Sequence, residues 1–267
     1  MATVQVLYWQ DVPSVVKAAD GAKRQLPDWF QQEIDRRAME QGLVGSDAYL
    51  EHWHWEDAEG DLDFQVSPIV TTESVGGTQT EVVIGAGKSG KVIAFRADNG
   101  KRVWTLNVGK HLNDTGPLPK KPITVCPGAL GGVETPMALN AGLVYVPWVD
   151  LCMKEGSTGF GGGFSFAGGK GGLAAVDTST GKIVWSHKYP TLAVGAATIA
   201  NDVVFTETYD GTIYAYNAKT GAKVWSVKAP NGINSFPAIT KTMFIVGAGA
   251  PASKKPLNEV AYSLHGQ

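Results

Sequence analysis

The chain contains many side chains that could bind an ion or a charged ligand, but they form no compact motif. Asparagine and carboxylate oxygens suit calcium, and lysine or protonated histidine can pair with a carboxylate. The residues of these types that we place near one surface, for reasons given below, are Lys88, His111, Asn113, Asp114, Glu134, Asp150, Glu207 and Asp210. Their spacing matches no metal-binding loop, so ordinary polar loop groups are the simpler interpretation.

The chain has two cysteines, Cys126 and Cys152, and two interpretations stay open. If the segments that hold them lie on one surface, a disulfide can close a loop of moderate length and stabilise the fold by roughly 3 kcal/mol. In a reducing compartment both thiols would stay free. We favour the disulfide.

Two other stretches suggest chemistry that their spacing does not support. The run His52–Trp55 (HWHW) has two histidines two positions apart, which do not share a helix face, so metal binding is disfavoured. The run Gly159–Gly172 (GFGGGFSFAGGKGG) lacks the Gly-Lys-Ser/Thr ending of a phosphate loop and opens no helix. We interpret this run as a flexible loop that carries aromatic side chains.

Repeated elements must position these residues. An eleven-residue phrase occurs at Ala94–Trp104 (AFRADNGKRVW), Ala175–Trp185 (AVDTSTGKIVW) and Ala215–Trp225 (AYNAKTGAKVW). Each copy predicts a strand, a turn closed by a glycine (Gly100, Gly181, Gly221), and a second strand ending in a tryptophan (Trp104, Trp185, Trp225). The later copies start at 175 and 215, 40 positions apart, which is typical of a β-propeller blade.

Further strands precede the repeated phrase at regular intervals. They are expected at Glu81–Ile84, Leu143–Val146, Asp202–Phe205 and Met243–Val246, and Glu259–Leu264 would close the last group. We therefore predict four blade-like groups, over roughly residues 64–110, 111–190, 191–230 and 231–267.

The second group is long because it carries two insertions, Lys110–Gly128 and Asp150–Lys170. The first joins one blade to the next, and the second joins two middle strands of a blade. Strand direction alternates in an antiparallel blade, so both insertions should emerge on one face. Loops on a rigid scaffold commonly build binding surfaces, so we predict a binding face here; a surface decoration without function is the alternative.

Residues 1–57 have a different pattern, which predicts a small α+β module. Val4, Val6 and Tyr8 alternate with polar residues and predict a strand. A helix is expected to begin at Pro27 and Asp28 and to end at Gly42, and Ser46 should cap a second helix. The apolar residues expected along the two helices are Trp29, Phe30, Ile34, Ala38, Met39, Tyr49, Leu50 and Trp53. Residues 58–63 form the predicted linker.

Composition excludes several classes of protein. Hydrophobic residues make up 43% of the 267 positions and charged residues 18%, which argues against disorder. The 23 basic and 25 acidic side chains nearly cancel and form no dense basic run, so neither nucleic acid nor an anionic membrane is indicated. No apolar run approaches the roughly 20 residues of a membrane span. The N-terminus lacks the features of a secretory signal, which predicts a cytoplasmic protein.

The repeat A-x-D-x-x-T-G-K-x-x-W, strictest at Ala175–Trp185, resembles that of the pyrroloquinoline quinone (PQQ) dehydrogenases and of PQQ-binding-like β-propellers. The resemblance covers about residues 63–267 and extends to Phe64–Val70 (FQVSPIV), Val83–Phe95 (VIGAGKSGKVIAF), Val204–Gly221 and Asn231–Ile239. It implies a mainly β fold with a partial propeller of about four blades. It also implies that the repeat tryptophans pack between neighbouring blades.

The same resemblance implies PQQ and a calcium ion on the propeller axis, with Lys88, His111, Asp114 and Glu134 as candidate cofactor-binding residues. The chain departs from the family pattern in two respects. Active alcohol dehydrogenases of this type carry adjacent cysteines above the quinone, whereas Cys126 and Cys152 lie 26 positions apart. Neither a calcium ligand set nor a catalytic aspartate aligns.

About four blades are half of the usual seven or eight, which leaves an open arc. Exposed sheet faces are normally covered by closure or capping. We therefore expect a protein partner or self-association to cover the arc.

Residues 1–57 resemble a different family, the small virulence factor domain found in conserved virulence factor C-like proteins. The resemblance rests on Val6–Val16 (VLYWQDVPSVV), Lys23–Met39 (KRQLPDWFQQEIDRRAM) and Ser46–Trp55 (SDAYLEHWHW). That domain implies a cytoplasmic setting, whereas PQQ-type propellers usually work outside the cytoplasm. The contrast suggests a fusion of two unrelated parts.

Two functions of different classes follow from the sequence. One is a non-catalytic binding or scaffold module that acts through the insertion-rich face and has no catalytic residue. The other is a PQQ- and calcium-dependent oxidoreductase that oxidises an alcohol or a sugar. We favour the scaffold, because the blade repeats are intact while the adjacent cysteines are missing and the calcium ligands cannot be assigned.

Overall fold

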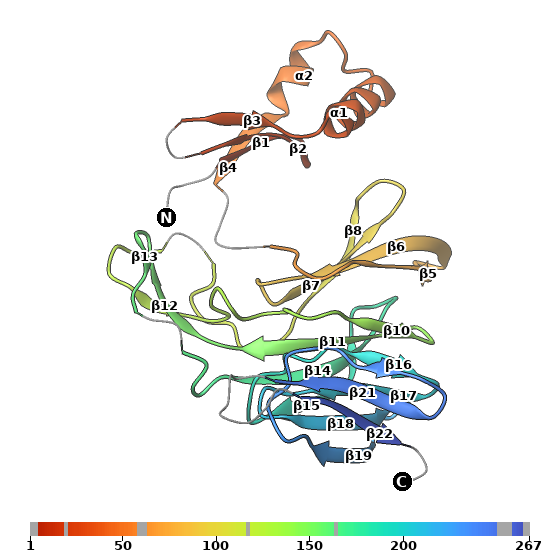
Figure 1. Ribbon diagram of the computed structural model, residues 1–267. Coiled ribbons are helices and arrows are strands. Elements are labelled where there is room, and N and C mark those ends of the chain that lie inside the picture. Colours follow the sequence, from red (N-terminus) through yellow and green to blue (C-terminus); the bar gives the residue numbers. More distant parts are fainter. Residues whose placement is uncertain are drawn as a thin grey trace. The chain divides into compact units, whose positions relative to one another are not determined.

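The chain divides into two compact units in the computed structural model (Figure 1). The structure describes residues 5–18, 21–57, 63–115, 118–162, 165–249 and 258–263. The first unit comprises residues 1–60 with 115–122 and 156–159, and the second comprises 61–114, 123–155 and 160–267. Of the predicted linker 58–63, all but Asp63 lies outside the described residues.

The first unit contains one antiparallel sheet and two helices. Its strands are β1 (Gln5–Trp9), β2 (Val12–Lys17), β3 (Lys23–Gln25) and β4 (Trp53–Asp57), in the order β3-β2-β1-β4. Its helices are α1 (Asp28–Glu40) and α2 (Asp47–Glu51), and Ser46 caps α2 by accepting a hydrogen bond from the Tyr49 N–H. Within the described residues, neither helix is both long enough and apolar enough to cross a membrane.

The core of the first unit confirms part of the predicted apolar pattern. Trp9 and Val12 of the sheet pack with Ile34 and Ala38, which lie one turn apart on α1. Phe30 and Tyr49 are partly buried against this core, whereas Trp29, Met39 and Leu50 are exposed. The prediction was wrong for Trp53, which begins strand β4 because it pairs with Trp9 across the sheet.

The second unit consists mainly of successive antiparallel sheets, which we call blades 1 to 4. Blade 1 contains β5 (Ile69–Val75), β6 (Thr78–Ala86), β7 (Lys91–Arg96) and β8 (Arg102–Asn107); blade 2 contains β10 (Ala138–Asn140), β11 (Leu143–Asp150), β14 (Lys170–Asp177) and β15 (Ile183–Tyr189); blade 3 contains β16 (Thr198–Ala200), β17 (Val203–Glu207), β18 (Thr212–Asn217) and β19 (Lys223–Lys228); and blade 4 contains β20 (Ala238–Ile239), β21 (Met243–Ala248) and β22 (Asn258–Ser263). This architecture confirms the predicted partial propeller of about four blades.

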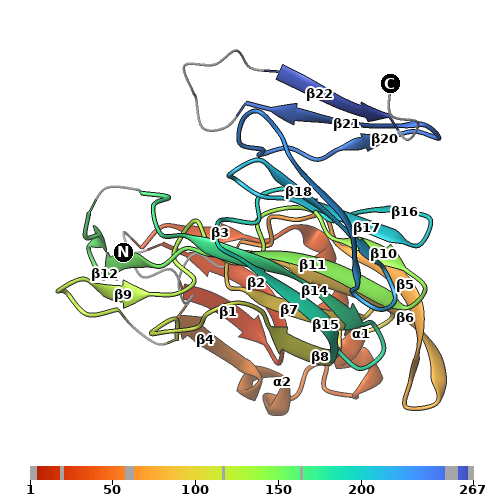
Figure 2. The ribbon, with the colours of Figure 1, turned by 90° about the horizontal axis from the view of Figure 1, so that it is seen from below.

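Apolar clusters join each blade to the next one in the chain. Side chains alternate between the two faces of a strand, so each blade presents one apolar face to each neighbour. One cluster joins blades 1 and 2 around Ile84 and Val144, a second joins blades 2 and 3 around Tyr145 and Val204, and a third joins blades 3 and 4. In Figure 2 strands β20–β22 lie at one end of this series of sheets.

The repeat tryptophans hydrogen bond to the neighbouring blade. The indole N–H of Trp104 donates to the Thr178 carbonyl at 2.8 Å, and that of Trp185 donates to the Ala218 carbonyl at 2.9 Å. Both carbonyls lie in the turn of the repeated phrase in the next blade. The glycine of each turn has positive φ, and a Cβ there would lie within 2.7 Å of the incoming indole, at Gly181 and Gly221 respectively. Glycine therefore allows the left-handed backbone of the turn and leaves room for the indole from the neighbouring blade.

The joint between blades 3 and 4 is less complete. Trp225 contacts Phe244 and Tyr262, with ring centroids 6.5 and 5.6 Å apart, but its side chain stays 38% exposed. A groove of about 820 Å³ runs between the two blades, and Val224, Trp225, Phe244 and Tyr262 are among its lining residues. The outer part of this joint is therefore open within the described residues.

Alanine substitutions at Gly100 and Gly181 should distinguish the cost of a left-handed backbone from the cost of a clash between blades. Gly100 and Gly181 have φ values of 68° and 69°, but a Cβ at Gly100 would meet no atom within 4 Å, whereas one at Gly181 would strike Trp104. Gly100→Ala should cost about 1–2 kcal/mol of unfolding free energy for the left-handed backbone. Gly181→Ala should cost about 1–3 kcal/mol more for overpacking. Urea denaturation of both variants measures the difference, and equal losses would contradict this account of the joint.

Candidate functional site

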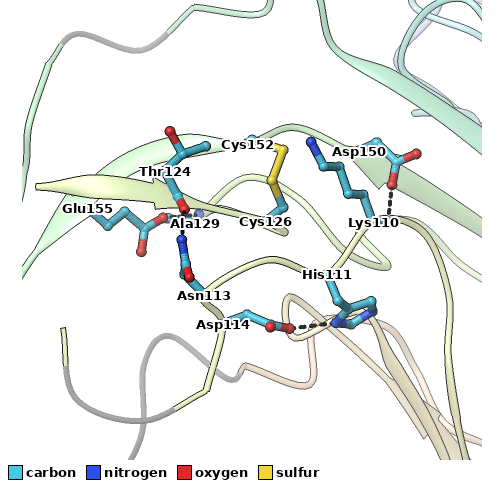
Figure 3. Close-up of a disulfide and its surroundings, with 10 residues drawn as sticks. All are labelled: Lys110, His111, Asn113, Asp114, Thr124, Cys126, Ala129, Asp150, Cys152 and Glu155. Atoms are coloured by element: carbon cyan, nitrogen blue, oxygen red, sulfur yellow. Dashed lines mark hydrogen bonds and ion pairs between the residues drawn. A yellow bond between two sulfur atoms is a disulfide. The ribbon is translucent and has the colours of Figure 1, made fainter.

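The two insertions join into one structural element, which we call the insertion lobe: residues 110–114, 123–132 and 150–155 (Figure 3). Strand β9 (Ile123–Val125) of the first insertion pairs antiparallel with β12 (Met153–Gly156) of the second, in a small sheet of order β13-β12-β9 with β13 (Gly159–Phe160). An isolated bridge also pairs Leu112 with Cys126. The insertions therefore form one surface rather than two independent loops.

A disulfide between Cys126 and Cys152 links the two insertions (Figure 3). Cys126 is fully buried, and its backbone exchanges two hydrogen bonds with Leu112, of 2.8 and 2.9 Å. Of the two states left open by the sequence, the structure thus contains the bridged one. The bridge closes the lobe where β9 ends and where the chain leaves β11.

Polar side chains brace the lobe internally. The Asp150 carboxylate accepts a hydrogen bond from the Lys110 N–H at 2.7 Å, and the buried Glu155 carboxylate accepts one from the Ala129 N–H at 3.0 Å. The Asn113 amide donates to the Thr124 carbonyl at 2.9 Å. These bonds satisfy backbone groups of irregular segments, which is the structural reason for polar side chains at these positions.

The four candidate cofactor-binding residues lie around one turn but pair with protein groups. Lys88 lies in the turn between β6 and β7 and forms an ion pair with Asp63 at 3.2 Å. His111 Nδ1 lies 2.5 Å from the Asp114 carboxylate, and its Nε2 lies 3.2 Å from the Val108 carbonyl. With the Gln65 side-chain amide turned so that its nitrogen faces the Glu134 carboxylate, it donates a hydrogen bond to that group.

The backbone shows why these residues are neighbours. The Val133 N–H donates to the Gly87 carbonyl at 2.9 Å, which holds the segment before Glu134 against the turn that contains Lys88. A Cβ at Gly90, in the same turn, would lie 3.2 Å from His111 Nε2. The fold therefore gathers the candidate residues at one place, where protein groups already contact each of them.

The donor set does not fit a calcium site. Among the residues that the structure describes, no group of three or more histidine, cysteine, aspartate or glutamate side chains could hold a metal ion. Asp150 and Glu155 are committed to backbone N–H groups, and Asp210 pairs with Lys228 at 2.5 Å. These side chains therefore supply no convergent set of oxygen ligands for calcium within the described residues.

Glu207 is buried, and its expected surface position was wrong. It ends strand β17, directly opposite Ile213, and neither carboxyl oxygen has a hydrogen-bond partner within the described residues. The whole side chain is shielded from solvent, and this burial raises the pKa of the carboxyl well above its usual 4.5. The neutral acid is therefore favoured.

An aromatic pair on this face is not visible in the sequence. The ring of Phe166 contacts the ring of Tyr209 in a tilted arrangement, with ring centroids 5.4 Å apart. Phe166 stays 46% exposed. Tyr209 in turn packs against a small cluster that includes Leu151 and Leu192. The available signal was the phenylalanine-bearing glycine run, but its partner Tyr209 lies in the turn of another blade.

Comparison with known protein families gives two matches. The family model PQQ_2, described as outer membrane protein assembly factor BamB, matches residues 88–252. A second model, described as virulence factor, matches residues 7–68. Both resemblances noted in the sequence are confirmed.

Individual relatives are quinoprotein dehydrogenases. A quinoprotein ethanol dehydrogenase of Pseudomonas putida is 38% identical over 159 residues, which cover 49% of this chain and 25% of that protein. Quinoprotein alcohol dehydrogenase PedH of Pseudomonas putida KT2440 is 29% identical over 226 residues, which cover 69% of this chain and 38% of the relative.

A solved structure shows the same fold. The quinohemoprotein alcohol dehydrogenase from Comamonas testosteroni superposes with a TM-score of 0.64 at 21% identity, over 78% of this chain and 39% of that chain. The chain thus spans a quarter to about two-fifths of the length of the proteins that it matches.

Loss of the disulfide should destabilise the second unit. The two cysteines are 26 positions apart, and closing a loop of that size contributes about 3 kcal/mol on the chain-entropy model. We expect the double variant Cys126→Ala, Cys152→Ala to unfold at a lower urea concentration than the oxidised protein. The reduced wild-type protein is the matched control, because it removes the bond and keeps both sulfurs; an unchanged midpoint in both would contradict the prediction.

Glu207 should make stability fall as pH rises. The carboxyl ionises from pH about 4.5 upward in the unfolded chain but stays protonated in the folded one. Ionisation therefore stabilises the unfolded chain, and the free energy of unfolding falls as pH rises until pH passes the raised folded pKa. Glu207→Gln removes this loss. We expect its stability advantage over wild type to grow by up to about 1.4 kcal/mol per pH unit above 4.5. Urea denaturation at several pH values tests this, with the exposed Glu81→Gln as control; parallel wild-type and Glu207→Gln curves would refute it.

Proposed function

The chain belongs to the PQQ_2 family, described as outer membrane protein assembly factor BamB, and from this premise we propose that its second unit is a non-catalytic scaffold that binds a protein partner or ligand through the insertion lobe. The observation that carries the proposal is the joining of two separate insertions into one braced element. A decoration without function would have no need of a sheet, a disulfide and buried polar bonds between two distant segments.

The rigidity and composition of this face support binding. Surfaces built on a stiff scaffold lose little conformational entropy when they bind. The exposed Phe166, held against Tyr209, supplies an aromatic side chain of the kind enriched in protein interfaces. The surface therefore combines a preformed shape with an apolar contact point.

The pairing of the ionisable groups supports a non-catalytic function. A general base or a metal ligand must be available to a substrate or an ion. Asp114 is engaged by His111, Glu134 by Gln65, and Lys88 by Asp63. A ligand would have to displace these partners first.

A second candidate function is that of a PQQ-dependent dehydrogenase acting on an alcohol or sugar, with calcium as the associated metal. The 38% identity to a quinoprotein ethanol dehydrogenase favours it, although the match covers a quarter of that protein. PQQ would supply the hydride acceptor. Lys88 and His111 would be the groups that meet its carboxylates, and Asp114 and Glu134 would complete the site.

The disulfide also bears on location. Disulfides persist mainly in oxidising compartments, so the Cys126–Cys152 bridge supports a site of action outside a reducing cytosol. This differs from the cytoplasmic expectation based on the N-terminal residues. We further propose that another chain covers the open faces of the blade series.

Titration with PQQ, with and without calcium, decides between the two candidates. We expect no saturable quenching of tryptophan fluorescence up to high micromolar PQQ, because the candidate contacts are already paired. Saturable, calcium-dependent quenching would overturn the non-catalytic proposal and would justify assays of alcohol and sugar oxidation.

A crosslinking arm tests the binding surface directly. A photoreactive benzoylphenylalanine at Phe166 should give discrete adducts, and the same group at the exposed Val184 of β15 is the control. We expect the Phe166 adducts to disappear when Cys126 and Cys152 are both alanine. Adducts that are equal at both positions would contradict binding at the face formed by the lobe and the neighbouring Phe166–Tyr209 pair.

A further inference from the structure

Two lysines of the first unit lie directly opposite each other across a strand pair. Lys17 of β2 pairs with Lys23 of β3 in an antiparallel hairpin, so the two side chains share one face of the sheet (Figure 1). Like charges at directly opposite positions are destabilising. Within the described residues, the two ammonium groups contact Gln5 and Trp55 rather than a carboxylate. The hairpin therefore concentrates positive charge that these contacts do not neutralise.

The indole of Trp55 brings the two ammonium groups together. The Nζ atom of Lys17 lies 5.6 Å from the centroid of this ring, and the Nζ atom of Lys23 lies 5.5 Å from it. Strand register explains the common target. Trp55 of β4 is opposite Leu7 of β1, and Leu7 is opposite Val15 of β2, two residues before Lys17. The tryptophan and both lysines therefore project from the same face of the sheet.

The two ammonium groups are close enough to act on one anion. Because both distances are measured to one centroid, the separation of the two groups cannot exceed the two distances together. That limit is comparable with the Debye length of about 8–10 Å at physiological salt, so screening leaves the two charges acting jointly.

Both ammonium groups keep hydrogen-bond donors for a ligand. Each has three N–H donors, and Lys17 gives one of them to the Gln5 side-chain oxygen at 3.3 Å. Lys23 is exposed, and Trp55 is 39% exposed, so a dissolved ligand can reach the pair. The site is therefore open and preformed.

The arrangement favours a compact anion with two negative charges. A phosphate monoester carries a charge of about −1.5 to −2 at pH 7 and has three strong acceptor oxygens on one phosphorus atom. One such group can offset both ammonium charges and relieve the repulsion across the hairpin. An anion with a single charge would leave one of the two ammonium charges without a counterpart.

We propose that Lys17, Lys23 and Trp55 form a binding site for a phosphate monoester dianion. The two lysines donate hydrogen bonds to the phosphoryl oxygens. Trp55 is a positioning residue, because cation–π attraction to its ring holds both ammonium groups in place. The site lies in the first unit and goes beyond the function proposed for the second, since it does not involve the insertion lobe.

A phosphorus NMR titration of glycerol phosphate with the full chain tests the site. We expect saturable line broadening for the wild-type protein. Lys17→Gln or Lys23→Gln should weaken binding roughly fivefold, as loss of one exposed ion pair predicts. Arg24→Gln is the matched control, because Arg24 belongs to the same hairpin but is opposite Val16 and projects from the other face. Its affinity should stay within about twofold of wild type.

A second ligand tests the requirement for two charges. Dimethyl phosphate is a diester with one negative charge, and at equal ionic strength we expect it to bind more weakly than glycerol phosphate. Vesicles that contain phosphatidic acid, compared with phosphatidylcholine vesicles, identify the source of the group. Binding to the phosphatidic acid vesicles as well as to glycerol phosphate supports a lipid headgroup, and binding to glycerol phosphate alone supports a dissolved ester.

Stability separates a binding site from a purely structural cluster. Glycerol phosphate should raise the urea midpoint of the wild-type first unit but not that of the double variant Lys17→Gln, Lys23→Gln. The double variant without ligand should be no less stable than wild type, because it removes the like-charge pair. Trp55→Leu leaves the charge unchanged and should weaken binding of glycerol phosphate. Unchanged circular dichroism would establish that these variants fold.

Three outcomes would overturn the inference. These are the absence of saturable broadening in the wild-type protein, equal losses for Arg24→Gln and the two lysine variants, and equal affinities for glycerol phosphate and dimethyl phosphate. None of them bears on the insertion lobe, which the PQQ titration and the crosslinking test separately. Failure of this inference is therefore distinguishable from failure of the proposed function.

Discussion

The hydrogen bond from an indole N–H in one blade to a turn carbonyl in the next is the interaction on which the second unit depends. Backbone pairing holds the strands of each blade together, whereas side-chain packing and a few hydrogen bonds, these among them, hold the blades to each other. Trp104 and Trp185 need a turn without a Cβ in the neighbouring blade, which Gly181 and Gly221 provide. The repeated phrase thus specifies both a hairpin and the position of the next hairpin.

Blade order also determines what the insertions can become. Two segments far apart in the chain emerge at the same end of their strands because direction alternates within a blade. Once adjacent, they pair as β9 and β12 and are linked by the disulfide. The polar side chains that could have served a metal ion instead stabilise this arrangement. Asp150 and Glu155 satisfy backbone N–H groups, so the same residues cannot be counted as free ligands.

The sequence predicted what is encoded locally and missed what depends on distant partners. The repeat predicted three of the four blade-like groups because its strand, glycine turn and tryptophan lie within eleven residues, and alternating strands predicted the fourth. Strand direction predicted that both insertions emerge on one face, but neither their pairing as β9 and β12 nor the partners of Asp150 and Glu155 could be predicted, since these lie on another segment. Trp53 was assigned to a helix because its strand pairing with Trp9 is not visible locally. Glu207 was placed at the surface because the end of its strand could not be located to one residue.

Glu207 also shows that the joints are unequal. The corresponding positions in the second strands of the other blades, two residues beyond Ile84, Tyr145 and Ile245, are Ala86, Pro147 and Gly247. Blade 3 alone therefore buries an ionisable group there, which weakens its joint with blade 4 as pH rises. The same joint is open at its outer end, where Trp225 lines a groove. Blade 4 is consequently the least firmly attached of the four.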